Sequence, residues 1–271
     1  MTGSLLELPT GNVWVEQFGT GQPVVYLHGI VDIHGIESEP MPFHRALAQH
    51  FQLIAPAHPG CAKSDEDEHL VTIDDVVFHY LRVFDALELD QFSLVGSSLG
   101  GWIAAEIAVR HPERIKKLTL ISPTGLAVPG HQIADIFWYA QPDDGVRYDG
   151  LRDLLFAEPG SESGKRLIPD AKDEIEREMG KYRVFRFASL IGFKPPYLYN
   201  PQLRSRLDRY GGPALIVWGQ HDSLVPRAHA EAYSTGFKNG RLEVLKNCGH
   251  SLYAEAPEPA AEIVQHFLTD D

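Results

Sequence analysis

The motif with the clearest chemical meaning in this chain is a serine between two glycines, Gly96-Ser97-Ser98-Leu99-Gly100. The apolar residues 91–95 before it predict a buried strand, and residues 102–110 after it predict a helix. In such a context, G-x-S-x-G holds the serine hydroxyl above the end of a sheet, at the N-terminus of the helix. Glycine is favoured on both sides because larger side chains would collide in so sharp a turn. The motif predicts that Ser98 is a nucleophile; a glycine-rich turn without catalytic function is the alternative.

A serine hydroxyl attacks well only when a base removes its proton and an acid orients that base. His250 follows the last predicted strand, residues 241–245, and Asp222 follows the strand before it, residues 214–218. Because the carboxyl ends of parallel strands lie at one edge of a sheet, we expect both side chains to approach Ser98. The order serine, aspartate, histidine along the chain is typical of hydrolases with a nucleophile elbow. Considered singly, His250 could be an ordinary loop histidine and Asp222 a turn or helix-capping residue.

Such a nucleophile also requires two hydrogen-bond donors for the oxyanion that develops on the substrate. We expect the first donor to be the backbone N–H of Leu99, directly after the nucleophile. The second is expected in the loop after the strand at residues 23–27, where Gly29 frees the turn before Ile30. The backbone N–H of Ile30 is therefore predicted to complete the oxyanion hole, and His28 is expected to brace the loop.

Composition limits the classes of function open to the chain. Its 271 residues carry a formal net charge of -13 without a basic run, which argues against nucleic acid and membrane partners. Residues 1–18 lack the charged start and apolar centre of a signal peptide, and no apolar stretch reaches the roughly 20 residues of a membrane span. Cys61 and Cys248 do not indicate a disulfide framework. We therefore expect a cytoplasmic protein that acts on a small molecule; its oligomeric state stays open.

The 13 histidines show no metal-binding spacing such as H-E-x-x-H, so neither a metal nor another cofactor is expected. His221 and His229, which flank a predicted helix start, are expected to be solvated. Cys248 lies two residues before His250 and is expected to be a small buried thiol rather than a second nucleophile.

Predicted strands alternate with predicted helices over most of the chain, which indicates an α/β fold with a mostly parallel sheet covered on both faces. The expected strands are residues 5–7, 12–18, 23–27, 52–55, 91–95, 117–121, 214–218 and 241–245. The expected helices are residues 41–50, 72–87, 102–110, 228–235 and 259–268. The alternation breaks in the middle, which predicts a core of residues 1–124 and 211–271 with an insertion at 125–210.

These motifs together resemble the α/β-hydrolase fold superfamily. The matching residues are His28-Gly29, Pro59-Gly60 with Ser64, Gly96-x-Ser98-x-Gly100-Gly101, Gly219-x-x-Asp222 and Gly249-His250. The resemblance implies a central sheet flanked by helices, with the insertion as a helical cap over the active site. It also implies that Ser98, Asp222 and His250 form a catalytic triad.

The resemblance and the motifs favour a metal-independent serine hydrolase of carboxylic esters or lactones, including acyl-homoserine lactones. A serine nucleophile differs from the aspartate of the haloalkane dehalogenases and epoxide hydrolases in this superfamily, so those two reactions are not expected. Cleavage of carbon–carbon bonds in vinylogous diketones is an alternative, although Ile30-Val31-Asp32-Ile33 lacks the small residues usual after His-Gly in those relatives. A receptor-like protein that binds a ligand and retains the triad is the other alternative.

The predicted insertion is rich in aromatic residues. Trp138, Phe185, Phe193 and Tyr197 are expected to line an apolar substrate pocket, although aromatic side chains here could equally form the core of the insertion itself. Two further features set this chain apart from the superfamily pattern. Cys61-Ala62 stands where a second glycine is common, and the loop at residues 30–40 is longer than a minimal one.

Overall fold

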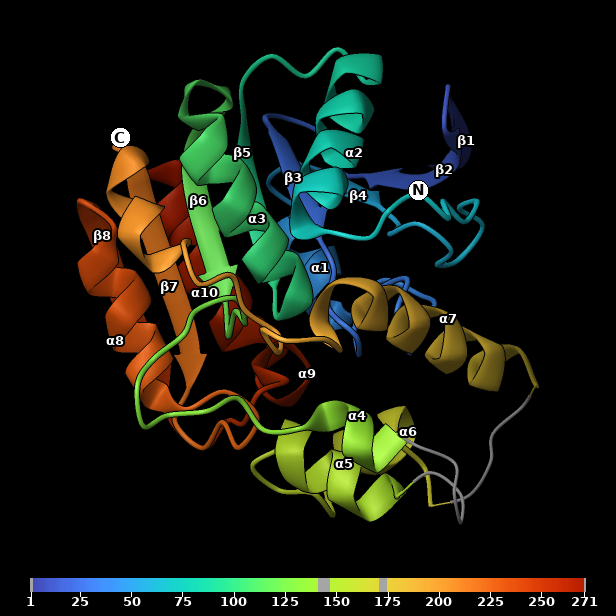
Figure 1. Cartoon of the computed structure of the whole chain (residues 1–271), viewed down its shortest axis with the longest axis vertical. Helices are drawn as coiled ribbons and strands as arrows, with labels where there is room; N and C mark the ends of the chain where they lie inside the picture. Colours follow the sequence, from blue (N-terminus) through green and yellow to red (C-terminus); the bar gives the residue numbers. More distant parts are fainter. Residues whose placement is uncertain (1, 141–146, 171–174, 271) are drawn as a thin grey trace.

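The centre of the structure, a computed structural model that describes residues 2–140, 147–170 and 175–270, is a twisted sheet (Figure 1). Its strands are β1 (Thr2–Leu8), β2 (Gly11–Phe18), β3 (Pro23–Leu27), β4 (Gln52–Pro56), β5 (Phe92–Ser97), β6 (Ile115–Ile121), β7 (Pro213–Gly219) and β8 (Asn239–Leu245). They lie in the order β1-β2-β4-β3-β5-β6-β7-β8. The ladders β1–β2 and β2–β4 are antiparallel, and the others are parallel. The predicted α/β fold with a mostly parallel sheet is confirmed.

Helices cover both faces of the sheet (Figure 1). One face carries α2 (Ile73–Ala86), α3 (Leu99–Arg110) and α8 (Arg227–Gly236), and the other carries α1 (Pro42–Leu47) and α10 (Pro257–Thr269). Because the central strands are buried on both faces, β5 is an unbroken run of buried residues. Three further short elements are the 3-10 turns η1 (Pro112–Arg114) and η2 (Arg204–Arg209) and the helix α9 (Leu252–Glu255).

A helical insertion joins β6 to β7 at the carboxyl edge of the sheet (Figure 1). Its described helices are α4 (Ile136–Ala140), α5 (Tyr148–Leu155), α6 (Glu162–Leu167) and α7 (Ile175–Gly192). The two ends of the insertion are paired, because the Gly125 N–H donates to the Leu198 carbonyl at 2.9 Å and the Asn200 N–H donates to the Gly125 carbonyl at 3.0 Å. The predicted helical insertion is thus present, while its boundaries at residues 125 and 210 stay a prediction.

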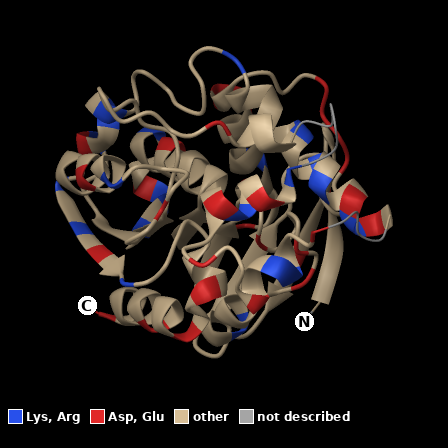
Figure 2. Ribbon diagram, turned by 90° about the horizontal axis from the view of Figure 1, so that it is seen from below, with Lys and Arg blue, Asp and Glu red and all other residues tan. Residues whose placement is uncertain are grey.

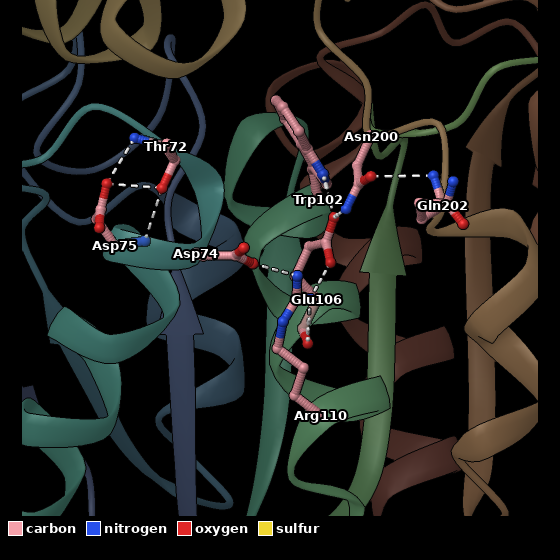
Figure 3. A network of polar contacts seen from close by, with 8 residues as sticks. All are labelled: Thr72, Asp74, Asp75, Trp102, Glu106, Arg110, Asn200 and Gln202. Atoms are coloured by element: carbon pink, nitrogen blue, oxygen red, sulfur yellow. Dashed lines mark hydrogen bonds and ion pairs between the residues drawn. The ribbon is translucent and has the colours of Figure 1, made fainter.

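A buried carboxylate fastens the return of the insertion to the core (Figure 3). Glu106 of α3 is fully buried and accepts hydrogen bonds from Trp102 Nε1 at 3.0 Å and Asn200 Nδ2 at 2.8 Å. Arg110, one turn further along α3, pairs with Glu106 and with Asp74 of α2. A buried charge costs little only when it is paired and hydrogen-bonded in this way. The network therefore ties the insertion to the helix that begins directly after Ser98.

Acidic and basic residues are interspersed along the helices seen from below (Figure 2). No helix among the described residues is long and apolar enough to cross a membrane. Within the same described ranges, no group of three or more histidine, cysteine, aspartate or glutamate residues is placed to hold a metal ion.

Five of the buried histidines lie in and around the loops that follow β3 and β4: His28, His34, His44, His58 and His79. Burial lowers the pKa of His44 and His58 to about 3 and that of His34 and His79 to about 4. The pKa of His28 is also lowered well below its usual value by burial. These imidazoles are therefore neutral in the folded protein, and the His58 ring stacks on Phe187 of α7 at 4.5 Å between ring centroids.

We expect the free energy of unfolding to fall steeply as the pH drops from about 6.5 toward 4. The unfolded chain protonates its histidines below about pH 6.5, whereas the folded chain does not, so each group costs about 1.4 kcal/mol per pH unit in this window. Asp32 opposes the trend: burial raises its folded pKa to about 7. As the pH falls, the Asp32 carboxyl therefore takes up its proton at a higher pH in the folded chain than in the unfolded chain, which raises the free energy of unfolding. Urea unfolding followed at several pH values measures the slope.

The variant His79→Phe tests whether a buried histidine contributes to this pH dependence. Both ring nitrogens of His79 lack a hydrogen-bond partner, and the ring packs edge-on against Tyr80, so phenylalanine preserves the packing. Asp67 and Arg82 act on this ring in opposite directions, and both remain in the variant. The slope should decrease by about 1.4 kcal/mol per pH unit. An unchanged slope would contradict the assignment of acid sensitivity to these rings.

Candidate active site

Ser98 stands at the sharp turn between β5 and α3, as predicted. Its backbone has φ 51° and ψ -112°, a strained conformation for a residue other than glycine. A Cβ on Gly96 would lie 2.4 Å from the Gly100 carbonyl oxygen, and one on Gly100 would lie 2.1 Å from the Leu27 carbonyl oxygen. Both positions therefore require glycine, and the turn fixes the direction of the serine side chain.

The three predicted catalytic side chains meet at the carboxyl edge of the sheet. His250 Nε2 lies 2.8 Å from Ser98 Oγ, and His250 Nδ1 lies 2.9 Å from Asp222 Oδ2. Asp222 Oδ1 accepts hydrogen bonds from the backbone N–H groups of Leu224 at 3.0 Å and Val225 at 2.8 Å. One carboxylate oxygen thus stabilises the turn while the other faces the imidazole. Ser98 is 5 % exposed and the His250 and Asp222 side chains 2 % and 1 %, so water is largely excluded from these contacts.

Glu255 holds the histidine loop against the insertion, a role that the sequence analysis missed. This residue ends the short helix α9, and its carboxylate accepts from the Gly249 N–H at 2.6 Å and from the Ala157 N–H at 2.7 Å. The Ser251 N–H also donates to the Leu155 carbonyl at 2.8 Å. Burial raises the pKa of Glu255, and its hydrogen bonds to backbone N–H groups oppose that shift. The backbone on both sides of His250 is therefore attached to the insertion.

The loop after β3 lies against the nucleophile turn because β3 and β5 are neighbours in the sheet. Leu27 is paired with Gly96 in their ladder, so residues beyond these positions leave the sheet side by side. A Cβ on Gly29 would lie 3.1 Å from Ser98 Cβ. The strand order reverses at this point of the sheet, where α/β proteins commonly bind ligands.

Ile30 and Leu99, the predicted oxyanion donors, are both next to this contact: one follows Gly29 and the other follows Ser98. Their role in an oxyanion hole stays a prediction. His28 braces the loop as expected, because its Nδ1 lies 2.8 Å from the Gly29 carbonyl oxygen and its Nε2 accepts from the His58 N–H at 2.9 Å.

The aromatic residues proposed for the pocket gather around Phe137 of α4, with one exception. Phe185, Phe193 and Tyr197 lie at ring-centroid distances of 6.1, 5.0 and 5.9 Å from Phe137. Trp138 is 58 % exposed. The Tyr197 hydroxyl donates to Asp135 Oδ1 at 2.7 Å. These contacts fit both expectations, a core of the insertion and a pocket wall, so the pocket assignment stays a prediction.

The parallel sheet, the strained serine turn and the Ser98–His250–Asp222 contacts define a serine hydrolase of the α/β type. A family model described as alpha/beta hydrolase fold matches residues 22–257, and the chain belongs to this family.

The chain is similar to relatives that differ in their activities, and it shares its fold with a solved esterase. The chain is 30% identical over 236 residues to a 2-hydroxy-6-oxononadienedioate/2-hydroxy-6-oxononatrienedioate hydrolase of Pseudomonas putida, covering 82% of this chain and 78% of that one. It is 26% identical over 236 residues to monoacylglycerol lipase abhd6-B of Xenopus laevis, where the match spans 79% of this chain but only 65% of the relative's length. An esterase from Exiguobacterium antarcticum shares the fold with a TM-score of 0.79 at 21% identity, covering 99% of this chain and 100% of that one.

Proposed function

We propose that this protein hydrolyses carboxylic esters through an acyl-enzyme on Ser98. The observation that carries the proposal is the continuous hydrogen-bonded path from Ser98 Oγ to His250 Nε2, at 2.8 Å, and from His250 Nδ1 to Asp222 Oδ2, at 2.9 Å. This arrangement activates a serine hydroxyl without a metal or another cofactor.

In the first half of the reaction, Ser98 Oγ attacks the ester carbonyl carbon while His250 Nε2 takes the hydroxyl proton. Asp222 holds the imidazole with its Nε2 free and stabilises the imidazolium that forms. The backbone N–H groups of Ile30 and Leu99 donate to the oxyanion. The imidazolium then protonates the leaving alcohol, and an acyl-enzyme on Ser98 remains.

In the second half, a water molecule takes the place of the alcohol. His250 removes a proton from the water as its oxygen attacks the acyl carbon. The tetrahedral intermediate then collapses, the proton passes from His250 to Ser98 Oγ, and the free acid leaves. The low exposure of the triad strengthens each electrostatic contact during these steps.

A second candidate reaction is the cleavage of carbon–carbon bonds, which is favoured by the similarity to the Pseudomonas putida dienedioate hydrolase. A substrate of that kind carries carboxylate groups, and a buried carboxylate requires a cationic partner. The two buried cationic side chains among the described residues are Arg152 and Lys181. Arg152 pairs with Asp170, and Lys181 Nζ lies 2.7 Å from Glu178 Oε1. Because both are already paired, the site better suits an uncharged ester.

We expect kcat/KM for p-nitrophenyl esters to rise about fourfold for each added methylene until the pocket is full. This factor corresponds to about 0.8 kcal/mol of burial free energy per methylene along an apolar wall. Steady-state rates with the acetate, butyrate, hexanoate and octanoate esters measure it. Equal kcat/KM across the series would contradict an apolar acyl pocket.

Two further substrates in the same assay separate the finer alternatives. Turnover of acyl-homoserine lactones at a kcat/KM comparable to that of the butyrate ester would extend the proposal to lactones, and inert lactones would confine it to open esters. If the protein rapidly bleaches a coloured 2-hydroxy-6-oxo-dienoate and does not turn over the esters, carbon–carbon cleavage would take the place of ester hydrolysis as the proposed function.

A further inference from the structure

Asp32 is a buried carboxylate in the loop after β3 that has no part in the triad. It is fully buried, as is Tyr26 of β3. Asp32 Oδ1 accepts from the Gly29 N–H at 2.7 Å, and Oδ2 accepts from the Tyr26 hydroxyl at 2.5 Å. Turn-forming aspartates normally lie at the surface, where water solvates the charge, whereas burying a carboxylate is costly. A buried one with two matched donors therefore indicates a requirement for a fixed backbone position.

Asp32 holds the peptide that directly precedes the one beside the nucleophile, because the Gly29 N–H belongs to the His28–Gly29 peptide. The Gly29 N–H is held by Asp32, and the Ile30 carbonyl is held by the Ile36 N–H at 2.8 Å. The Gly29–Ile30 peptide, which carries the Ile30 N–H, lies between these two anchors, and its Gly29 carbonyl oxygen is also held by His28 Nδ1 at 2.8 Å. The Gly35 N–H closes the loop by donating to the Asp32 carbonyl at 2.9 Å.

Polar and titratable groups from several elements surround this carboxylate. Tyr26 of β3 and Ser97 of β5 both lower the pKa of Asp32. Burial and then the Asp32 charge raise the pKa of Tyr26 and of Tyr253 in α9. The His44 ring of α1 packs edge-on against Tyr26 at 4.6 Å between ring centroids. Burial raises the pKa of Asp32 to about 7. Its two accepted hydrogen bonds favour the ionised form.

We propose that Asp32, itself held by the Tyr26 hydroxyl, is a positioning residue that sets the Ile30 N–H at the oxyanion of the reacting ester. The inference rests on the proposed function, since an oxyanion forms only if Ser98 attacks a carbonyl group. Asp32 acts through Gly29, which joins the peptide that Asp32 holds to the Gly29–Ile30 peptide, and does not itself touch the substrate.

The test compares two buried tyrosine hydroxyls, that of Tyr26 near the carboxyl ends of the parallel strands and that of Tyr210 near their amino ends. Tyr26→Phe removes the donor to Asp32. Tyr210→Phe is the matched control, because Tyr210 is equally buried and its hydroxyl donates to the Pro213 carbonyl at 3.2 Å, at the start of β7. Asp32→Ala and Asp32→Asn complete the set, and asparagine can still accept from the Gly29 N–H. The readouts are kcat and KM for p-nitrophenyl butyrate, the Kd of phenylboronic acid, and the midpoint of urea unfolding.

We expect Tyr26→Phe to lower kcat by about 10-fold and Asp32→Ala by about 100-fold with little change in KM, because a displaced oxyanion donor acts on the transition state. Phenylboronic acid forms a tetrahedral adduct with the serine, so its affinity should fall in parallel. Asp32→Asn should recover part of the loss, and Tyr210→Phe should lower stability without lowering kcat. If Asp32→Ala does not fold, the two tyrosine variants and Asp32→Asn still decide.

Three outcomes would overturn the inference. In the first, Tyr26→Phe and Asp32→Asn match wild type in kcat and boronate affinity. In the second, their kcat falls only as far as that of Tyr210→Phe at equal loss of stability. Both outcomes leave the proposed ester hydrolysis intact. In the third, wild type itself forms no boronate adduct and turns over no ester, and the proposed function fails together with the inference.

Discussion

Ser98→Ala is expected to lower kcat for p-nitrophenyl esters by about 10⁶-fold, to the limit of detection. The variant lacks the only atom that can form the acyl-enzyme, while Leu99 and Ile30 keep whatever binding they provide. The hydrogen-bond partner of Ser98 Oγ is the His250 ring, and alanine keeps the Cβ and the backbone of the turn. The midpoint of urea unfolding should therefore change little, and the measurement that checks both points is steady-state kinetics beside an unfolding curve.

Covalent labelling gives an independent reading of the same prediction. A fluorophosphonate should modify wild type on Ser98 and leave Ser98→Ala unmodified. Ser97→Ala is the neighbouring control, since Ser97 ends β5 directly before the turn and should not affect which residue is labelled. Peptide mass spectra that place the label on Ser97, or substantial turnover by Ser98→Ala, would show that the nucleophile lies elsewhere.

Asp222→Asn is expected to lower kcat by about 10⁴-fold with the fold intact. The asparagine carbonyl can still accept from the Leu224 and Val225 N–H groups, so the turn is retained. Its amide then points an N–H at His250 Nδ1, which must accept, and the imidazole proton moves to Nε2. Nε2 so protonated cannot take the proton of Ser98. Steady-state kinetics measures the loss.

Asp85→Asn is the matched control, because the Asp85 side chain pairs with Arg114 at the surface and is 67 % exposed. It should have normal kinetics. Near-normal kcat in Asp222→Asn would mean that another carboxylate orients His250. The end of β6 offers no substitute, because Ser122-Pro123-Thr124 follows it in the sequence.

The sequence allowed the sheet and the triad to be predicted because both depend on local patterns. The central strands appear as apolar runs, whereas β8 alternates between polar and apolar residues. Of the predicted triad, Ser98 directly follows β5, and Asp222 and His250 lie in the segments after β7 and β8. Helix ends were predicted less well: the helix expected at residues 41–50 is the shorter α1, Pro42–Leu47. The helix expected at residues 72–87 is α2, Ile73–Ala86, and its N-cap Thr72 accepts a hydrogen bond from the Asp75 N–H.

Burial that depends on the insertion could not be predicted from local pattern. The expectation that His229 is solvated is wrong, since the residue is fully buried and its Nε2 lies 2.7 Å from the carbonyl oxygen of His131. His131 lies in the first part of the predicted insertion, before α4 and 98 residues earlier in the chain. Nothing near His229 in the sequence indicates which helix face that segment covers.

Glu255 and Asp32 were missed for the same reason. Glu255 contacts the backbone of Ala157 across 98 positions, and α9, which carries it, is too short to produce a periodic pattern. Asp32 stands in a loop, and the groups that surround it, such as Tyr26 of β3 and Tyr253 of α9, come from other elements. Carboxylates that hold the backbone of the loops around a site are not marked by a sequence motif.

The pairing of Gly125 with Leu198 and Asn200 gives the insertion a closed base. The entropic cost of joining the two ends of a segment grows only with the logarithm of the length of the loop between them, about 0.6 kcal/mol for each doubling. Helices can thus be added, lost or exchanged between these ends while β6 and β7 keep their register. In a fold of this kind, changes in the insertion can alter the substrate range while the sheet and the residues at its carboxyl edge keep their positions.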